Sequence, residues 1–102
     1  MSNNQQNPQT ENKAVRVVVH GKVQGVWYRA WTVENAGELN LDGWVRNRHD
    51  STVEAVLFGP SGNVDQMLKR MQDGPPLARV ERLVVTEDAE DIQTGFHQRS
   101  TV

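Results

Sequence analysis

A chain of 102 residues is long enough to bury the core of one domain and too short for two. It contains no cysteine, which excludes disulfides, thiolate metal sites and thiol nucleophiles. No apolar run approaches the roughly 18 residues of a membrane span, and the N-terminus lacks the apolar segment of a signal peptide. We therefore expect a cytoplasmic protein without membrane contact.

The net charge of −2 is unevenly distributed along the chain. Residues 13–48 contain six Lys and Arg against three Asp and Glu, whereas residues 49–102 contain five against nine. The positive part suits a small anionic ligand, because the local field rather than the net charge governs such binding. The overall acidity argues against a broad nucleic-acid surface, so no nucleic-acid partner is expected.

The N-terminal segment and the first strand are distinguished by their apolar pattern. Residues 1–12 are polar and have no periodic apolar face, so they are predicted to form a disordered leader before a domain spanning 13–102. In residues 14–20, β-branched side chains alternate with Arg16 and His20, which predicts a strand.

A helix and a hairpin are predicted next. The helix covers about 28–39, and its buried face is expected to be the stripe Val26, Ala30, Val33 and Gly37. Residues 43–48 and 52–59 read as strands, and the short turn between them predicts a hairpin.

A second helix and one or two strands complete the chain. Asn63 with Gln66 three residues later reads as a capping box. The spacing of a buried helical face follows in Val64, Met67, Leu68 and Met71. Residues 74–76, Gly-Pro-Pro, are expected to end this helix, a strand is predicted over about 78–87, and a weaker one near 94–99.

The order of the predicted elements is β-α-β-β-α-β. It is typical of an α+β, ferredoxin-like split β-α-β fold, in which an antiparallel sheet carries both helices on one face.

The segment from Gly21 to Arg29, Gly-Lys-Val-Gln-Gly-Val-Trp-Tyr-Arg, links the first strand to the first helix. Gly21 and Gly25 can adopt positive φ and let backbone N–H groups converge on one anion. A helix N-terminus adds oriented dipoles, and Arg29 offers a charged fork of donors. Taken alone, the glycine spacing is more typical of a flexible turn.

Asn47 lies near the end of the second predicted strand, and the strand alternation turns it toward the helices. Its amide can orient a water but cannot deprotonate one, and the same residue type also forms turns. The histidines are His20, His49 and His97; they lie on separate elements without metal-site spacing, so no metal or cofactor is expected.

The predicted site thus offers an anion cradle and a water-orienting amide, with no evident nucleophile or strong acid. Such a site suits a carboxyl-phosphate anhydride, because its carboxylate leaving group, with a pKa of roughly 4 as the acid, departs without a proton. Phosphoryl transfer is mostly positioning and charge stabilisation, so an arginine, amides and an aligned water suffice.

The segment from Gly21 to Arg29, together with Gly43-Trp44-Val45-Arg46-Asn47, resembles the acylphosphatase family. Three further motifs match and extend the resemblance over about residues 13–99: Val53-Glu54, Gly74-Pro75-Pro76 and Gly95-Phe96. The resemblance implies a ferredoxin-like fold and metal-free hydrolysis of acyl phosphates to carboxylate and inorganic phosphate.

By the same resemblance, Arg29 binds the phosphoryl oxygens and Asn47 holds the attacking water. The cradle of the phosphoryl group is formed by Gly21, Lys22, Val23, Gln24, Gly25, Val26 and Trp27. The sequence departs from the family at Tyr28, where phenylalanine is common, and at Ser51, where glycine is common. We expect the Tyr28 hydroxyl to find solvent or a partner, and the turn at Ser51 to be strained or of another type.

Two other functions are compatible with the predicted fold. A non-catalytic module could bind RNA on sheet aromatics, of which Trp44 and Phe58 are the obvious ones, or bind a small anionic effector. A purely structural domain would show neither phosphate affinity nor turnover. Nothing in the pattern requires a partner chain, so a monomer is expected.

Overall fold

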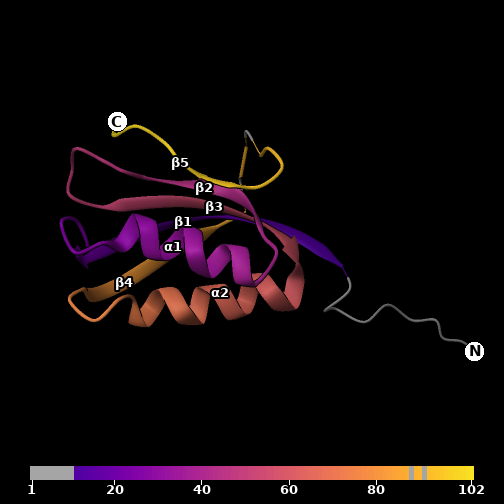
Figure 1. Cartoon of the computed structure of the whole chain (residues 1–102), viewed down its shortest axis with the longest axis horizontal. Helices are drawn as coiled ribbons and strands as arrows, with labels where there is room; N and C mark the ends of the chain where they lie inside the picture. Colours follow the sequence, from indigo (N-terminus) through magenta and orange to yellow (C-terminus); the bar gives the residue numbers. More distant parts are fainter. Residues whose placement is uncertain (1–10, 88, 91) are drawn as a thin grey trace, which may run out of the picture.

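The computed structural model describes residues 11–87, 89–90 and 92–102, and it confirms the predicted β-α-β-β-α-β order with a short fifth strand (Figure 1). The elements are β1 (Asn12–Lys22), α1 (Tyr28–Glu38), β2 (Asp42–Asn47), β3 (Val53–Pro60), α2 (Ser61–Asp73), β4 (Arg79–Thr86) and β5 (Phe96–Gln98). Both helices pack on one face of the sheet, as predicted (Figure 1). Neither described helix has the length and apolar character to cross a membrane.

The strands follow the order β4-β1-β3-β2-β5 across one sheet. The first four strands pair antiparallel, as predicted. β5 instead runs parallel to β2, with Phe96 opposite Gly43, so the whole sheet is mixed. The last residue of β4 and the first residue of β2 lie at the same end of the sheet. A chain that crosses from β4 to the opposite edge at that end therefore runs beside β2 in the same direction.

The core lies between the sheet and the helices. β1 buries alternate side chains, β3 is buried on both faces from Val53 to Leu57, and α2 buries Val64, Met67 and Met71 beside a partly buried Leu68, as its spacing predicts. The strand residues of this core with no exposure are Val17, Val19, Val45, Val53, Ala55 and Leu57.

The predicted stripe is only partly right: Val26, just before α1, is buried in the core and Val33 packs against it, but the buried face of the helix itself is different. Its buried residues are Tyr28, Thr32 and Ala36, whereas Ala30 and Val33 are partly buried and Gly37 is exposed. Polar atoms go into the core here because each finds a backbone partner. The Tyr28 hydroxyl donates to the Met71 carbonyl at 2.6 Å, and the Thr32 hydroxyl donates to the Tyr28 carbonyl at 2.8 Å. The expectation that the Tyr28 hydroxyl finds a partner is confirmed.

The start of α2 also differs from its prediction. The N-cap is Pro60 and no side chain caps it, so the capping box at Asn63 is wrong. Asn63 Nδ2 donates instead to the Leu39 carbonyl at 2.9 Å, and the Ser61 N–H donates to the Glu11 carbonyl at 2.6 Å. The helix ends at Gly74, φ 69°, as predicted.

The boundary of the predicted leader shifts by one residue in the described part. β1 begins at Asn12, which pairs with Pro60 of β3. Residues 1–10 lie outside the described residues, so the leader there stays a prediction.

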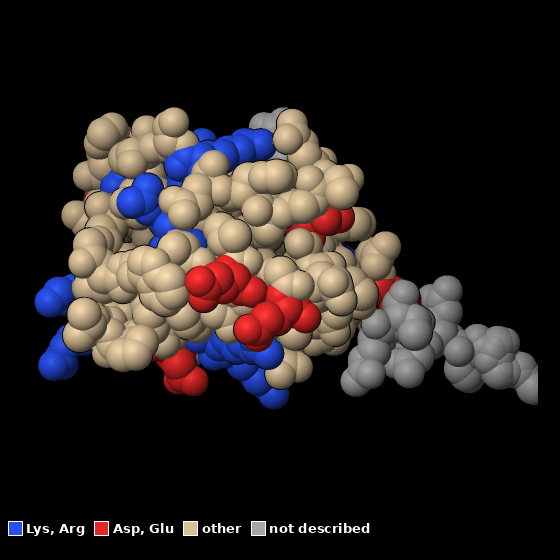
Figure 2. Space-filling model, in the orientation of Figure 1, with Lys and Arg blue, Asp and Glu red and all other residues tan. Residues whose placement is uncertain are grey.

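Three connections lie at the same end of the molecule: the β1–α1 loop, the β2–β3 turn and the α2–β4 turn (Figure 1). On the face shown in Figure 2, Lys and Arg side chains project at this end, while a conspicuous group of Asp and Glu atoms lies over the middle. This end of the sheet therefore positions the cradle predicted from the sequence.

Candidate active site

A pocket of about 250 Å³ opens between the β1–α1 loop and the ends of β2 and β5. Its lining residues are Val23, Gly25, Trp27, Tyr28, Arg29, Ala30, Asn47 and Gln98. The fold thus brings Arg29 and Asn47, which lie on different elements, into one cavity.

The loop that walls this pocket has two residues in left-handed backbone. Gly25 has φ 74° and Trp27 has φ 72°. A Cβ added at Gly25 would meet nothing within 4 Å. Glycine is therefore favoured there by the left-handed backbone conformation and not by a lack of space for a side chain. A non-glycine residue in this region is uncommon and strained, and such strain concentrates at functional sites.

The left-handed Trp27 is the N-cap of α1, and it makes no side-chain capping bond. The first helical bond runs from the Trp31 N–H to the Trp27 carbonyl at 3.1 Å. The N–H groups of the first turn precede any intrahelical acceptor, so they suit an anion placed in the pocket.

Gln24 fastens the loop to the β2–β3 turn. Its Nε2 donates to the carbonyls of Arg48 and Thr52, both at 2.8 Å. The two donors of one amide are therefore used to hold the cradle against the turn that directly follows Asn47. Hydrogen bonds from Thr52 also hold the pKa of the Asp50 carboxyl in this turn below its ordinary value.

Arg29 lies in the first turn of α1 and is partly buried. Its guanidinium makes no ion pair or hydrogen bond to the residues that the structure describes. A partly buried guanidinium with all its donors available is a strong partner for a phosphoryl group, because it can bind two oxygens at once.

Asn47 is the last residue of β2, opposite Val53 of β3. Its backbone carbonyl accepts from the Val102 N–H at 3.2 Å, but its side-chain Oδ1 is buried with no hydrogen-bond partner in the described chain. An unsatisfied buried acceptor costs about 1–3 kcal/mol, so it marks a place where a donor such as water is wanted.

The seven residues predicted to form the cradle are only partly gathered by the fold. Val23, Gly25 and Trp27 line the pocket. Gly21 and Lys22 are the end of β1, opposite Val80 and Arg79 of β4. A Cβ on Gly21 would lie 2.1 Å from the Arg79 carbonyl oxygen, so the glycine there permits the close approach of β4.

The remaining two cradle residues have structural surroundings of their own. Val26 is buried in the core cluster, and the Gln24 side chain is committed to the turn. Phosphate binding through the backbone of these four residues stays a prediction.

Three lining residues were missed by the sequence analysis: Tyr28, Ala30 and Gln98. Gln98 reaches the pocket because β5 runs beside β2, and no periodicity in three residues signals that pairing. Tyr28 forms part of the wall, but its hydroxyl is bonded to Met71, and burial raises the pKa of Tyr28 far above its ordinary value. This phenol therefore stays neutral.

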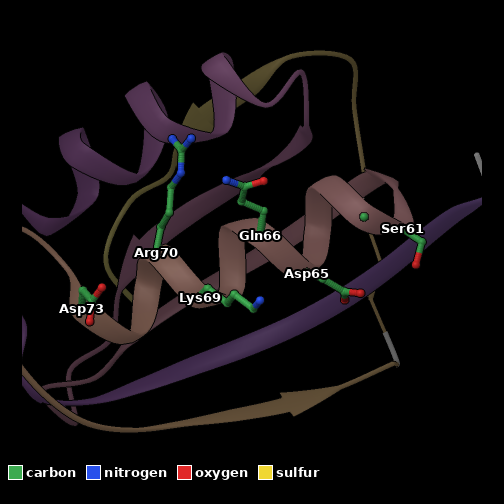
Figure 3. Close-up of a pocket in the computed structure, with 7 residues that line it drawn as sticks. Ser61, Asp65, Gln66, Lys69, Arg70 and Asp73 are labelled. Atoms are coloured by element: carbon green, nitrogen blue, oxygen red, sulfur yellow. The ribbon is translucent and has the colours of Figure 1, made fainter. Parts of the chain in front are cut away.

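A roomier hollow of about 610 Å³ runs along the outer side of α2 (Figure 3). Two of its charged groups already have partners: Arg70 bonds to Glu38 at 2.7 Å and to Asn35 at 2.8 Å, and Asp65 pairs with Lys13 at 2.7 Å. Volume alone does not make a site, and it is the smaller pocket that has a buried acceptor without a partner, Asn47 Oδ1, and the Arg29 guanidinium in its lining.

The open face of the sheet carries a covered aromatic. Trp44 is only 3% exposed, because the guanidinium groups of Arg46 and Arg99 lie 4.6 Å from its ring centre. Glu54 in turn pairs with Arg16 and with Arg46. The indole is therefore not open for base stacking, which removes the main support for an RNA-binding platform.

The fold and the pocket define a small α+β domain of the ferredoxin-like class, with Arg29 and Asn47 in one cavity at the start of a helix. The acylphosphatase family model matches residues 15–98, and the chain belongs to the acylphosphatase family. As a member of that family, it is a hydrolase acting on acyl phosphates.

Known acylphosphatases are similar to this chain, in sequence and in structure, over most of its length. The acylphosphatase of Rhizorhabdus wittichii is 53% identical over 89 residues, covering 87% of this chain and 90% of the relative. The acylphosphatase of Rhodospirillum rubrum is 53% identical over 90 residues, covering 88% and 99%. The solved structure of an acylphosphatase from Coxiella burnetii superposes with a TM-score of 0.81 at 33% identity, over 86% of this chain and 93% of that one.

Proposed function

We propose that the chain hydrolyses acyl phosphates without a metal ion, with Arg29 and loop amides holding the phosphoryl group and Asn47 holding the attacking water. The observation that carries this proposal is the pocket itself. It brings an unpaired guanidinium and an unpartnered buried amide oxygen together with the first turn of a helix.

The phosphoryl group would bind by charge and by a ring of donors. Arg29 can form two parallel hydrogen bonds to its oxygens, and the amides of the left-handed loop and of the first turn of α1 supply the others. These contacts also neutralise the charge that spreads over the phosphoryl oxygens in the transition state.

Asn47 would orient the nucleophile. Its Oδ1 accepts a hydrogen bond from a water, which places the water oxygen toward phosphorus. A new P–O bond forms to that water while the P–O bond to the acyl group breaks, and the carboxylate leaves with the electron pair. The water protons end on the phosphate product and in solvent.

The leaving group explains why the pocket needs no acid. A carboxylate has a conjugate acid of pKa roughly 4, so it departs unprotonated at neutral pH. A phosphate monoester releases an alkoxide, which generally requires an acid or a metal ion. The described residues contain no group of three His, Cys, Asp or Glu that could hold a metal ion.

The test is hydrolysis of acetyl phosphate in the presence of a chelator, followed as phosphate release, with 4-nitrophenyl phosphate as the matched ester. We expect turnover of the acyl phosphate that the chelator does not change, and little turnover of the ester. Loss of turnover on chelation, restored by a divalent cation, would contradict the metal-free proposal.

Arg29→Lys tests the role of the guanidinium. An ammonium keeps the charge but cannot bind two oxygens at once, so we expect kcat/KM to fall by about a hundredfold or more. Circular dichroism and denaturation of the same variant check that it folds. A folded Arg29→Lys enzyme with wild-type activity would remove this residue from the site. The cytoplasmic location and the monomeric state predicted from the sequence stay predictions.

A further inference from the structure

Trp27 is a large apolar side chain that lies largely outside the core. Its side chain is 58% exposed, and it is the one large exposed apolar residue of the described chain that also lines the pocket. The other such side chains, which lie outside the pocket lining, are Leu77, Val84, Val85 and Val102.

The indole of Trp27 also has no ring partner. The neighbouring aromatics Tyr28 and Trp31 pair with each other, with ring centres 5.4 Å apart, and the Trp27 side chain makes no hydrogen bond or ring contact in the described part of the chain. An apolar surface is thus held at the mouth of the pocket on a strained, left-handed residue.

The in-line geometry of phosphoryl transfer indicates which part of the substrate would contact the indole of Trp27. The acyl group leaves on the side of phosphorus opposite the attacking water. Asn47 and Gln98 belong to the adjacent strands β2 and β5, whereas Trp27 lies at the junction of the loop and α1. A leaving group directed away from Asn47 is therefore directed away from the strand side of the pocket.

We propose that Trp27 is the acyl subsite, and that its indole selects acyl phosphates whose acyl group is aromatic or extended and apolar. This inference rests on the proposed function, because it concerns the carbon side of the same substrate. An aromatic acyl group can stack on an exposed indole, whereas an acetyl group covers little of it.

The experiment compares kcat/KM for benzoyl phosphate and for acetyl phosphate in wild type, Trp27→Ala, Trp27→Gly and Trp27→Phe. We expect the benzoyl-to-acetyl ratio to fall about threefold to tenfold in Trp27→Ala and to be largely kept in Trp27→Phe. Trp27→Gly also removes the indole and fits the left-handed backbone without strain, so it carries the test if Trp27→Ala does not fold. Val84→Ala, an exposed valine on β4 outside the pocket, is the control and should keep the wild-type ratio.

The outcomes separate the two proposals. If the wild type hydrolyses both substrates and the ratio is unchanged in Trp27→Ala and Trp27→Gly, the acyl subsite is elsewhere and the proposed function stands. If the wild type hydrolyses neither substrate, the proposed function fails, and the subsite with it.

Discussion

Ser51, in the β2–β3 turn beside the pocket, shows what the sequence can predict about the backbone of a single residue. The resemblance places a common glycine there, so a strained turn or another turn type was expected, and the structure gives Ser51 a left-handed φ of 77°. Arg29 and Asn47 were likewise expected to share a site, since the family resemblance assigned both to it, and both line the pocket. The strain at Trp27 was not predictable, because nothing in its neighbours demands a left-handed tryptophan.

Replacing Ser51 with glycine should stabilise the protein. Left-handed backbone costs an L-residue about 1–2 kcal/mol, and glycine returns roughly 0.5–1 kcal/mol of that as greater entropy of the unfolded chain. We expect Ser51→Gly to raise the free energy of unfolding by about 0.5 kcal/mol in urea denaturation. Ser100→Gly, at a serine without positive φ, is the control and should not stabilise. A Ser51→Gly protein no more stable than wild type would mean that the turn is not strained.

At the scale of elements, the buried face of α1 was mispredicted because the prediction assumed that polar side chains stay outside the core. The apolar stripe was expected to face the core, but Tyr28 and Thr32 are buried there because their hydroxyls reach backbone carbonyls. The buried face of α2 was predicted correctly, because no polar side chain competes with its apolar residues for the core. The link between the β1–α1 loop and the β2–β3 turn was invisible to the sequence, since Gln24 bonds to backbone atoms 24 and 28 residues away.

Gln24→Glu tests this link between two elements. The two side chains have the same size, but a carboxylate cannot donate to the carbonyls of Arg48 and Thr52 and would repel them. We expect a loss of about 2–3 kcal/mol in the free energy of unfolding. Acetyl phosphate kcat/KM should fall by about tenfold or more, because the cradle is no longer held against the strand of Asn47.

The matched control for this change is Gln66→Glu. Gln66 lies exposed on α2, along the hollow of Figure 3, and the same substitution there should alter neither quantity noticeably. If Gln24→Glu behaved like Gln66→Glu, the loop would be held by its backbone alone.

On the scale of the whole molecule, the sheet separates the apolar core and the pocket from a face covered by charged side chains. One face packs on the helices, and its end carries the pocket, whereas the opposite face is closed by ion pairs and arginines over Trp44. The α+β class, the helix layer and the antiparallel pairing of four strands followed from element order. The parallel β5 did not, because the long return from β4 to the far edge leaves no periodic signal in the chain.

Glu54 tests the independence of the two faces. Its side chain is 7% exposed and pairs with Arg16 and Arg46, so Glu54→Ala leaves two partly buried guanidinium groups without that partner. We expect a loss of about 2–3 kcal/mol in the free energy of unfolding, while the folded fraction keeps wild-type kcat/KM. Asp65→Asn breaks the exposed pair with Lys13 and should cost no more than about 1 kcal/mol. Equal effects of the two changes would show that the buried pair does not stabilise the open face.

The most direct test of the whole account is Asn47→Ala, with acetyl phosphate turnover and inhibition by inorganic phosphate measured on the same protein. If Asn47 orients the water while Arg29 and the loop bind the phosphoryl group, kcat should fall by about a hundredfold or more. The inhibition constant of phosphate should then stay within about threefold of wild type, because ground-state binding is left intact. A folded Asn47→Ala enzyme with wild-type kcat, or one whose phosphate affinity falls as steeply as its turnover, would contradict the account.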